Sequence, residues 1–379
     1  MTIKALFLIF HGFSPHQGIS KKIGYQIKAL QQCGMDVQLC YLTIDENGHH
    51  KRMINKETLE DYGKGMLAKI KKRINYSKLA DYIFETKIRF LYIRSFHNAN
   101  PFLISMLRKL KKKGITAVLE IPTFPYDQEY KKVKLVELPG IFFDRLLRKK
   151  LAKQVKRIVT FSNDRFIFDS PTINISNGID FDEIKTRKQS HPRPDFIRLI
   201  GVAEIHFWHG FDRVITGLSN YYKTNTPLKV YFDIVGDGVP GELAKLNALV
   251  AENKLEEFVT FHGPKSGDAL DQLFEETDMG IGSLGRHRSQ ITYIKPLKNR
   301  EYAARGIPFI YSEIDEDFEH MAYVMKAPAD ESPLDINRII EFIYQNNFKP
   351  EDIRKTIVEK LSWKIQMGKV AKITESTVY

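Results

Sequence analysis

The sequence predicts an α/β fold with two doubly wound domains, each a parallel sheet covered by helices. In both halves of the 379-residue chain, short apolar runs alternate with longer amphipathic segments. This alternation is typical of parallel strands that are joined by helices and buried on both faces. The length favours two domains over one, and 43% of the residues are apolar, enough for a large core. We expect ligands to bind at the carboxyl ends of the strands.

The first half contains five apolar runs that we assign to strands, at residues 5–10, 37–42, 90–93, 117–119 and 157–160. Segments with apolar residues at helical spacing lie between them, the clearest at 20–33 and 102–113. The second half repeats the pattern with runs at 197–202, 229–235, 259–261, 279–281 and 309–311. A polar, proline-containing stretch at 185–194 separates the two series. We therefore place the domains at 1–185 and 186–379.

Composition excludes several classes of protein. The chain has no run of 18 apolar residues and no basic segment followed by a cleavable apolar one. Cys33 and Cys40 are too few for a disulfide framework, and neither has metal-ligand neighbours at zinc spacing. The expectation is a cytoplasmic protein with packed thiols, no membrane span and no export signal.

Charge is distributed unevenly along the chain. Residues 1–185 hold 33 Lys and Arg against 18 Asp and Glu, a net charge of +15, whereas residues 186–379 hold 25 against 28, a net charge of −3. The first half should therefore meet an anionic partner. Nucleic acid is excluded as the main candidate because no helix-turn-helix, zinc-finger, RNP or KH signature is present.

An anionic membrane surface fits the basic clusters better, because apolar residues are interleaved with the basic ones. The clusters lie at 69–74, 108–113 and 141–157. In the last, Phe143, Leu147 and Leu151 recur every four residues while Arg145 falls on another face. An ordinary helix that packs this stripe on its own core is the alternative. Both can hold if only the basic face touches lipid headgroups, which would make the protein peripheral to the inner face of the membrane.

The most informative segment is 296–308, whose residues predict a turn followed by a short helix that ends at Gly306. A loop that leads into a helix N-terminus suits a phosphate, because backbone N–H groups point out of it. Lys298 can add a point charge, and the Glu301 carboxylate can accept hydrogen bonds from ribose hydroxyls. The alternative is an amphipathic helix whose charges face water.

Four turns are expected to line a cleft between the two domains. They lie at 11–20, with Gly12, His16 and Gly18, at 175–180, at 236–238, and at 282–288 before the segment just described. Glycines in these turns permit close backbone approach. His97, after the strand end at Arg94, is a further histidine on this side, and we expect some of these histidines to touch substrate and the rest to cap or pack.

Several stretches together resemble the retaining GT-B glycosyltransferases of family 4, which use nucleotide-sugar donors. They are 235–238 (Val-Gly-Asp-Gly), 176–180 (Ser-Asn-Gly-Ile-Asp), 298–308 and 361–363 (Leu-Ser-Trp). The stretches 208–213, 297–306 and 120–126 are similar to a bacterial subgroup that builds surface polysaccharides. The resemblance implies two Rossmann-like domains facing a central cleft, an acceptor-binding one at 1–185 and a donor-binding one at 186–379. It leaves open that the last helix crosses back to the first domain.

Two departures from the family pattern affect the site. The family usually has two glutamates separated by seven residues, and Glu301 matches the second while Tyr293 stands at the first. The family also places Arg and Lys after the first strand of the second domain, where this chain has Glu204 and His209. A diphosphate still needs cations, so the resemblance moves that role to Lys298, Arg286 or Arg288.

The resemblance thus implies three sets of site residues. The catalytic set is Lys298, Glu301 and His209. The donor-binding set is Gly18, Asn177, Gly236, Gly238, Arg286, Arg288, Lys298 and Glu301. The acceptor-side set is His16, Arg94, His97, Glu120 and Tyr126.

Retaining enzymes of this family are thought to need no protein nucleophile, because the leaving diphosphate can take the acceptor's proton. Catalysis then rests on stabilising that diphosphate and orienting the acceptor. No cofactor or obligatory metal is expected, and the histidines lack ligand spacing. The expected partners are a UDP- or GDP-sugar, a lipid-linked oligosaccharide and an anionic membrane. The alternatives are a soluble or protein acceptor, and a GT-B-like binding protein that has lost turnover.

Overall fold

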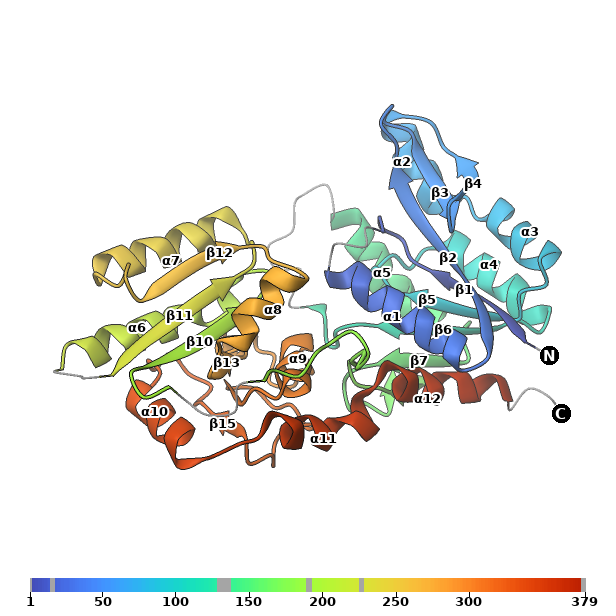
Figure 1. Ribbon diagram of the computed structural model, residues 1–379. Coiled ribbons are helices and arrows are strands. Elements are labelled where there is room, and N and C mark those ends of the chain that lie inside the picture. The colour runs from blue at the N-terminus through green and yellow to red at the C-terminus, as the bar shows by residue number, and fades with distance from the viewer. Residues whose placement is uncertain (1, 14–17, 128–137, 189–192, 225–227, 376–379) are drawn as a thin grey trace. The chain divides into compact units, whose positions relative to one another are not determined.

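The computed structural model describes residues 2–13, 18–127, 138–188, 193–224 and 228–375. The chain forms two compact units (Figure 1). Unit 1 comprises Met1–Ser176 and Trp363–Tyr379, and unit 2 comprises Asn177–Ser362. The division differs from the expected boundary at 185/186. Residues just after Asn177 already belong to unit 2, because the Ile179 amide donates to the Leu361 carbonyl at 2.7 Å and the Arg187 amide to that of Arg305 at 2.9 Å.

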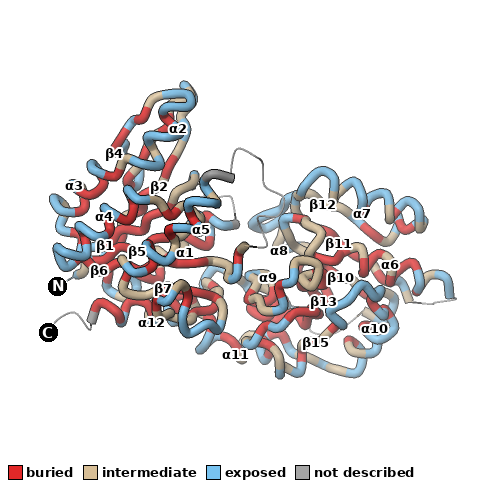
Figure 2. Tube along the Cα trace, turned by 180° about the vertical axis from the view of Figure 1, so that it is seen from behind, coloured by how far each residue is buried: buried red, intermediate tan, exposed pale blue. Residues whose placement is uncertain are grey.

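Unit 1 is built on a nine-stranded sheet in the order β4-β3-β2-β1-β5-β6-β7-β9-β8. The strands are β1 (Ile3–Leu8), β2 (Met35–Ile44), β3 (His50–Ile54), β4 (Glu57–Asp61), β5 (Phe90–Arg94), β6 (Thr116–Ile121), β7 (Arg157–Thr160), β8 (Phe166–Ile167) and β9 (Ser170–Asn174). The run from β2 to β9 is parallel, whereas β3, β4 and β8 pair antiparallel. Figure 2 shows the central strands as buried.

Helices cover both faces of this sheet. They are α1 (Gly18–Gln32), α2 (Gly65–Ile74), α3 (Ser77–Glu85), α4 (Pro101–Lys112), α5 (Leu138–Ala152) and α12 (Trp363–Glu375). Side chains of α3, α4 and α5 form one core with the sheet, and side chains of α1 and α12 form the other. The last helix therefore lies beside α1 in unit 1 (Figure 1), the arrangement that the sequence left open.

Unit 2 is built on a six-stranded, fully parallel sheet in the order β12-β11-β10-β13-β14-β15. The strands are β10 (Phe196–Val202), β11 (Lys229–Val235), β12 (Val259–Gly263), β13 (Met279–Ile281), β14 (Phe309–Tyr311) and β15 (Val324–Lys326). The helices are α6 (Phe211–Tyr222), α7 (Pro240–Glu252), α8 (Asp268–Glu275), α9 (Leu297–Arg305), α10 (Ile336–Gln345) and α11 (Pro350–Leu361), with 3-10 turns η3 (Phe207–His209) and η4 (Arg286–Ser289). α6, α7 and α10 pack into one core and α8, α9 and α11 into another.

The topology of unit 2 creates a switch point between β10 and β13. From β10 the chain proceeds outward through β11 and β12, and from β13 it proceeds the opposite way through β14 and β15. Ligands of open α/β sheets bind where the strand order reverses in this way, beyond the carboxyl ends of the strands. The loops there carry η3 after β10, η4 after β13 and the start of α9.

The ten apolar runs assigned from the sequence all coincide with strands, and the α/β fold with two Rossmann-like domains is confirmed. Strands β3, β4, β8, β9 and β15 were not foreseen, because short strands at or near the edges of a sheet carry weak patterns. Both cysteines are free thiols, Cys40 buried and Cys33 half-buried. Within the described residues, no helix is both long and apolar enough to cross a membrane.

Candidate functional site

Ionisable side chains gather at the switch point of unit 2. His209 comes from η3 after β10, Arg286 from η4 after β13, Lys298 from the first turn of α9, and Glu313 from the loop after β14. Three of these residues were predicted from the sequence, and they belong to three separate segments of the chain. The fold of unit 2 brings them to one edge of its sheet.

Lys298 and His209 are in direct contact. The Lys298 Nζ lies 3.1 Å from His209 Nδ1, and His209 Nε2 lies 3.0 Å from the Glu204 carbonyl oxygen. A carbonyl can only accept a hydrogen bond, so Nε2 carries the ring proton and Nδ1 accepts from the lysine. His209 thus orients the Lys298 ammonium, and its Nδ1 cannot donate a hydrogen bond to a ligand.

Burial shifts the pKa values of this cluster. Desolvation, followed by the charges of Lys298 and Arg286, lowers the pKa of His209 well below its ordinary value, so the ring is neutral. Desolvation also lowers the pKa of the Lys298 ammonium, although Glu313 opposes this and part of the side chain remains exposed. Burial raises the pKa of Glu313, against the effects of Lys298 and Arg286. Perturbed groups of this kind are a signature of functional sites.

A buried ion pair anchors the helix that carries Lys298. Arg300 is fully buried, and its guanidinium donates to the two carboxylate oxygens of Asp315 at 2.5 and 2.8 Å. It also bonds Asp317 and the Pro296 carbonyl oxygen. Arg300 is therefore a structural anchor, as its position on a different helix face from Lys298 suggests.

Glu301 lies on the second turn of α9 and is half-buried. Its Oε1 accepts hydrogen bonds from Nε and Nη2 of Arg305 at 3.1 and 3.0 Å. Arg305 in turn bonds Asp271 of α8 at 2.7 Å. The carboxylate is thus fixed on the side of α9 that meets α8.

Gly236 and Gly238 are required by the contact between two loops of unit 2. Gly236 has a φ of 131°, and a Cβ there would collide with the Ala203 carbonyl. A Cβ at Gly238 would collide with the backbone of Ile205, which forms an isolated parallel bridge with Gly238. The loops after β10 and β11 approach each other so closely that glycine is needed at both positions even without a ligand. The donor-binding role predicted for Gly236 and Gly238 therefore stays a prediction.

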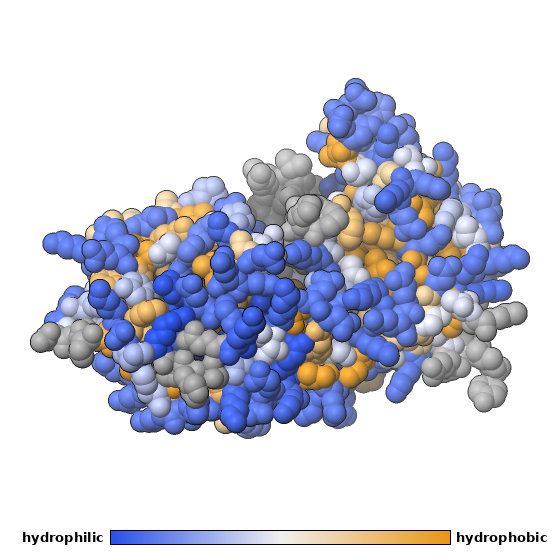
Figure 3. Space-filling model, viewed as in Figure 1, coloured by the Kyte–Doolittle hydropathy of each residue, from blue (hydrophilic) through white to orange (hydrophobic). Residues whose placement is uncertain are grey.

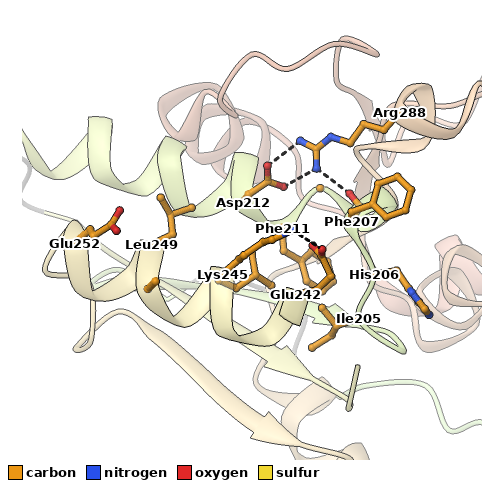
Figure 4. A pocket seen from close by; sticks show the side chains of 13 residues that line it. Ile205, His206, Phe207, Phe211, Asp212, Glu242, Lys245, Leu249, Glu252 and Arg288 are labelled. Atoms are coloured by element: carbon orange, nitrogen blue, oxygen red, sulfur yellow. Dashed lines mark hydrogen bonds and ion pairs between the residues drawn. The ribbon is translucent and has the colours of Figure 1, made fainter. Parts of the chain in front are cut away.

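The two predicted arginines of η4 differ in what they contact. The Arg286 guanidinium stacks over the Trp208 ring, 5.2 Å from its centre, beside the Lys298 cluster. Arg288 forms a bidentate ion pair with Asp212 at 3.0 and 2.7 Å and donates to the Phe207 carbonyl (Figure 4). It also bonds Glu331. These contacts hold the Arg288 guanidinium within the protein.

Arg288 also lines a cavity of about 480 Å³ between α6 and α7 (Figure 4). Its wall includes Ile205, Phe211 and Leu246, and a Glu242 to Lys245 ion pair of 2.7 Å lies at its rim. Neither Lys298 nor Glu313 lines it. The cavity and the charged cluster are therefore separate features of unit 2.

Asn177 begins unit 2 and reaches the approach to α9. Its Nδ2 donates to the Lys295 carbonyl oxygen at 2.6 Å, and its Oδ1 is buried with no hydrogen-bond partner within the described residues. The Asn177 side chain thus contacts the backbone two residues before the first residue of α9. The structure therefore places it near Lys298, which was also predicted to bind the donor.

In unit 1, Arg94 and Glu120 form a buried ion pair at the carboxyl ends of β5 and β6. Glu120 also accepts from Gln26 at 2.8 Å and Tyr92 at 2.5 Å. Burial alone would raise the pKa of Glu120, but Arg94, Lys22 and these hydrogen bonds hold it below its usual value. The carboxylate is enclosed by protein, so these contacts describe a structural network, and the predicted acceptor contact is not supported by them.

The remaining acceptor-side residues also lie in unit 1. The His97 ring lies 3.9 Å from the Tyr126 ring, and Tyr126 donates to Asp144 at 2.9 Å. Burial lowers the pKa of His97 to about 4, so this ring is neutral. Gly18 is the first residue of α1. His16 lies outside the described residues.

The sequence did not identify Glu313 as a site residue. Its signal is present in hindsight, because an acidic residue directly follows the apolar run of β14, and the carboxyl ends of parallel strands meet at one edge. Its burial, by contrast, is a result of tertiary packing that no local pattern reveals. Among the described residues, no group of three or more His, Cys, Asp or Glu is arranged to hold a metal ion.

In comparisons by sequence, neither a protein-family model nor a curated protein matches this chain. Solved structures match it over nearly its whole length. A glycosyltransferase from Rickettsia africae is 14% identical with a TM-score of 0.65, covering 100% of this chain and 99% of the other. Sucrose-phosphate synthase from Thermosynechococcus elongatus is 13% identical with a TM-score of 0.70, covering 99% of both chains. Anabaena HepE in complex with UDP is 15% identical with a TM-score of 0.63, covering 99% of this chain and all of the other. These likenesses show that the chain has the fold of the GT-B glycosyltransferases.

Proposed function

We propose that this protein is a glycosyltransferase that takes a sugar from a nucleotide-sugar donor. The proposal rests on the position of the Lys298 ammonium. A hydrogen bond to His209 holds this group at the N-terminus of α9, which lies at the switch point of unit 2. Helix N-termini and lysines both bind phosphate groups, and no side chain caps this helix.

The comparisons support a nucleoside diphosphate as the leaving part of the donor. HepE has been solved in complex with UDP, with UDP and glucose, and with UDP-glucose. We infer a UDP- or GDP-sugar for this chain, with Lys298 and Arg286 against the diphosphate and Glu301 accepting from the ribose. Asn177, Gly236 and Gly238 would shape the same side of unit 2.

The proposed reaction retains the configuration of the transferred sugar, following the resemblance to family 4. Positive charge at Lys298 stabilises the diphosphate as its bond to the sugar breaks. A leaving oxygen of that diphosphate takes the proton of the acceptor hydroxyl, so no protein nucleophile is required. His209 orients Lys298, since its ring is neutral and its Nδ1 accepts the lysine hydrogen bond.

The proposed acceptor is a lipid-linked oligosaccharide for a surface polysaccharide, reached from the cytoplasmic face of a membrane. Support comes from helix α2 of unit 1, whose exposed residues include Met66, Leu67, Ile70 and Ile74 beside Lys69, Lys71 and Arg73. Met66 and Leu67 are 79% and 71% exposed. Apolar and basic side chains together on one short helix suit an anionic lipid surface.

Helix α5 adds a second such surface on unit 1. Leu147 and Leu151 pack into the core, whereas Phe142, Phe143 and Leu146 are at least half exposed. Hydrophobic atoms thus reach the surface of unit 1 among charged ones (Figure 3). Arg148, which belongs to the basic cluster at 141–157, pairs with Asp127 at 3.0 Å and stacks on Phe168, so it contributes little to such a surface.

A thermal-shift screen of UDP-, GDP- and ADP-sugars tests the donor proposal, because a ligand that binds only the folded state raises its stability. Release of free sugar from the stabilising donor then distinguishes an enzyme from a binding protein. The matched variants are Lys298→Ala and, as a control, Lys355→Ala, which removes a 76% exposed lysine of α11. Stabilisation by no donor contradicts the proposal, and transfer to soluble oligosaccharide alone favours the soluble-acceptor alternative.

A further inference from the structure

The segment between β10 and α6 consists largely of aromatic residues. Residues 206–211 are His-Phe-Trp-His-Gly-Phe, and residues 203–211 contain no Lys or Arg. The His206 ring stacks on Trp208, with ring centres 4.1 Å apart and 14° between the planes. The His209 ring stacks on Phe211 at 5.7 Å and 26°, and the centres of Trp208 and His209 are 6.2 Å apart. The segment thus places a series of rings at the switch point of unit 2.

Two other segments of unit 2 bring cations to these rings. The Arg286 guanidinium, from η4, lies over Trp208 with its central carbon 5.2 Å from the ring centre. The Lys298 ammonium, from α9, lies over Phe211 at 5.4 Å, in addition to its hydrogen bond with His209. A cation within about 6 Å of an aromatic ring centre is attracted by the negative face of the ring. Each of the two cations that we place against the diphosphate therefore contacts an aromatic residue of the same segment.

Backbone hydrogen bonds join this aromatic segment to the loop after β13. The Leu284 amide donates to the His209 carbonyl oxygen at 3.0 Å, and the Gly285 amide donates to that of Trp208 at 3.2 Å. The second of these bonds lies one residue before Arg286. The backbone that carries the guanidinium and the backbone that carries the ring are therefore held together by the fold, and the contact of the two side chains does not depend on a chance approach of a long arginine.

We propose that Trp208 is a positioning residue, whose ring holds the Arg286 guanidinium where the donor diphosphate binds. The inference rests on the proposed donor site and extends it by a residue that acts through Arg286. A free arginine side chain samples many rotamers, and ordering it on binding costs affinity. Contact with a ring that is itself stacked on His206 orders the guanidinium before the donor arrives. Trp208 thus does for Arg286 what His209 does for Lys298.

A merely structural role for Trp208 predicts a different result. The residue is half-buried, and its ring also meets that of Phe207 edge-on at 5.0 Å, so its removal can loosen η3 for reasons unrelated to Arg286. Such loosening would weaken donor binding whether or not the Arg286 guanidinium is present. A positioning role, in contrast, disappears once the guanidinium is gone. Removing both side chains in one variant therefore separates the two roles.

Titration calorimetry with UDP, GDP and inorganic pyrophosphate tests the role on the unmodified protein, Trp208→Leu, Arg286→Ala and the double variant. Trp208→Leu is expected to weaken binding by about three- to thirtyfold, the range of a cation–π contact. Trp208→Phe keeps a ring and should retain most of the affinity. In the Arg286→Ala background, Trp208→Leu should weaken binding little further. The control Tyr344→Leu removes a 44% exposed ring of α10 and should bind like the unmodified protein.

A second measurement needs no nucleotide. The chain has two tryptophans, and Trp363 is 3% exposed, so quenching of tryptophan fluorescence by acrylamide reports mainly on Trp208. Arg286→Ala uncovers the Trp208 ring and is expected to raise the quenching constant. Arg338→Ala, which removes an exposed arginine of α10, should leave it unchanged. Equal quenching in Arg286→Ala and the unmodified protein would mean that the guanidinium does not cover the ring.

Failure of this inference can be told apart from failure of the proposed function. If the unmodified protein binds a nucleotide or pyrophosphate but the losses in the double variant are additive, Trp208 is merely structural and only its positioning role is overturned. Unchanged quenching in Arg286→Ala overturns that role whether or not a nucleotide binds. If the unmodified protein binds none of the three ligands, the donor proposal is contradicted, and the role of Trp208 is overturned with it.

Discussion

Arg300 and Asp315 face each other in a bidentate ion pair that solvent does not reach, with both side chains 0% exposed. The pair ties α9 to the loop after β14, the two segments that carry Lys298 and Glu313. Asn299 adds a hydrogen bond of 3.1 Å from Nδ2 to the same carboxylate. The relative positions of Lys298 and Glu313 thus depend on the Arg300 and Asp315 ion pair, which is not itself part of the proposed donor contacts.

Arg300→Ala should therefore destabilise unit 2 strongly. Removing one partner of a buried pair leaves the Asp315 charge uncompensated, at a cost of about 3 to 5 kcal/mol. Thermal or urea unfolding measures the loss, and Arg338→Ala on the exposed face of α10 is the control. A variant as stable as the control would show that the pair contributes nothing.

Lys298→Ala should affect turnover far more than stability. Loss of the charge that faces the diphosphate is expected to lower donor hydrolysis about a hundredfold or more. Melting temperature should change less than in Arg300→Ala, because burial already favours the neutral form of Glu313 and the His209 ring is neutral. If Arg300→Ala, assayed where it is folded, loses more turnover than Lys298→Ala, the assignment of roles on α9 is reversed.

Glu301→Gln should weaken nucleotide binding while leaving the fold intact. A charged hydrogen bond to ribose contributes about 1.5 to 3 kcal/mol, which corresponds to roughly ten- to hundredfold in affinity. Titration calorimetry with UDP or GDP measures it against Glu359→Gln, an exposed glutamate of α11. Equal affinity in both variants would remove Glu301 from the donor site.

Gly236→Ala should destabilise unit 2 because no side chain fits at that position. The φ of 131° and the Ala203 carbonyl together predict a loss of about 2 to 4 kcal/mol. Gly241→Ala is a matched control within α7, where a Cβ meets nothing within 4 Å and should be neutral or stabilising by up to about 1 kcal/mol. Chemical denaturation compares the two, and equal stabilities would contradict the close approach of the loops.

The membrane proposal predicts salt-sensitive binding to anionic vesicles. Each basic residue near the surface contributes about 1 kcal/mol, over a Debye length of roughly 8 Å at physiological salt. Replacing Leu67 and Ile70 of α2 by Asp should release the protein from vesicles, whereas Val358→Asp on α11 should not. Cosedimentation at low and high salt measures this, and equal binding to neutral and anionic vesicles rules the docking model out.

Much of the fold followed from the sequence because parallel strands buried on both faces appear as continuous apolar runs. The alternation from 197–202 to 309–311 was enough to foresee the sheet of unit 2. The strands β3 and β4 at one end of the sheet were missed, since Arg52, Glu57 and Glu60 interrupt any apolar pattern there. Arg52 and Glu60 are nevertheless buried, which only tertiary packing determines.

The site was foreseen in part for a similar reason. Lys298 could be singled out because a turn and a helix start are local signals. The position of Glu313 beside the segment that leads to α9 depends on the bridge between Tyr293 and Ile314, a contact that no short pattern encodes. The ion pairs of Arg288 could not be foreseen, because its partners Asp212 and Glu331 lie far away in sequence and come near it only when unit 2 folds.

Because α12 packs in unit 1, the two units can complete their folds only in a fixed order during synthesis of the chain. Unit 2 is continuous from Asn177 to Ser362 and has all its strands as soon as those residues have left the ribosome. Unit 1 can complete its core only after α12 has been synthesised, since Trp363, Met367 and Val370 belong to the core beneath α1. Until then the emerging chain exposes that apolar face, and shortening it by a dozen residues would damage the half of the molecule that was made first.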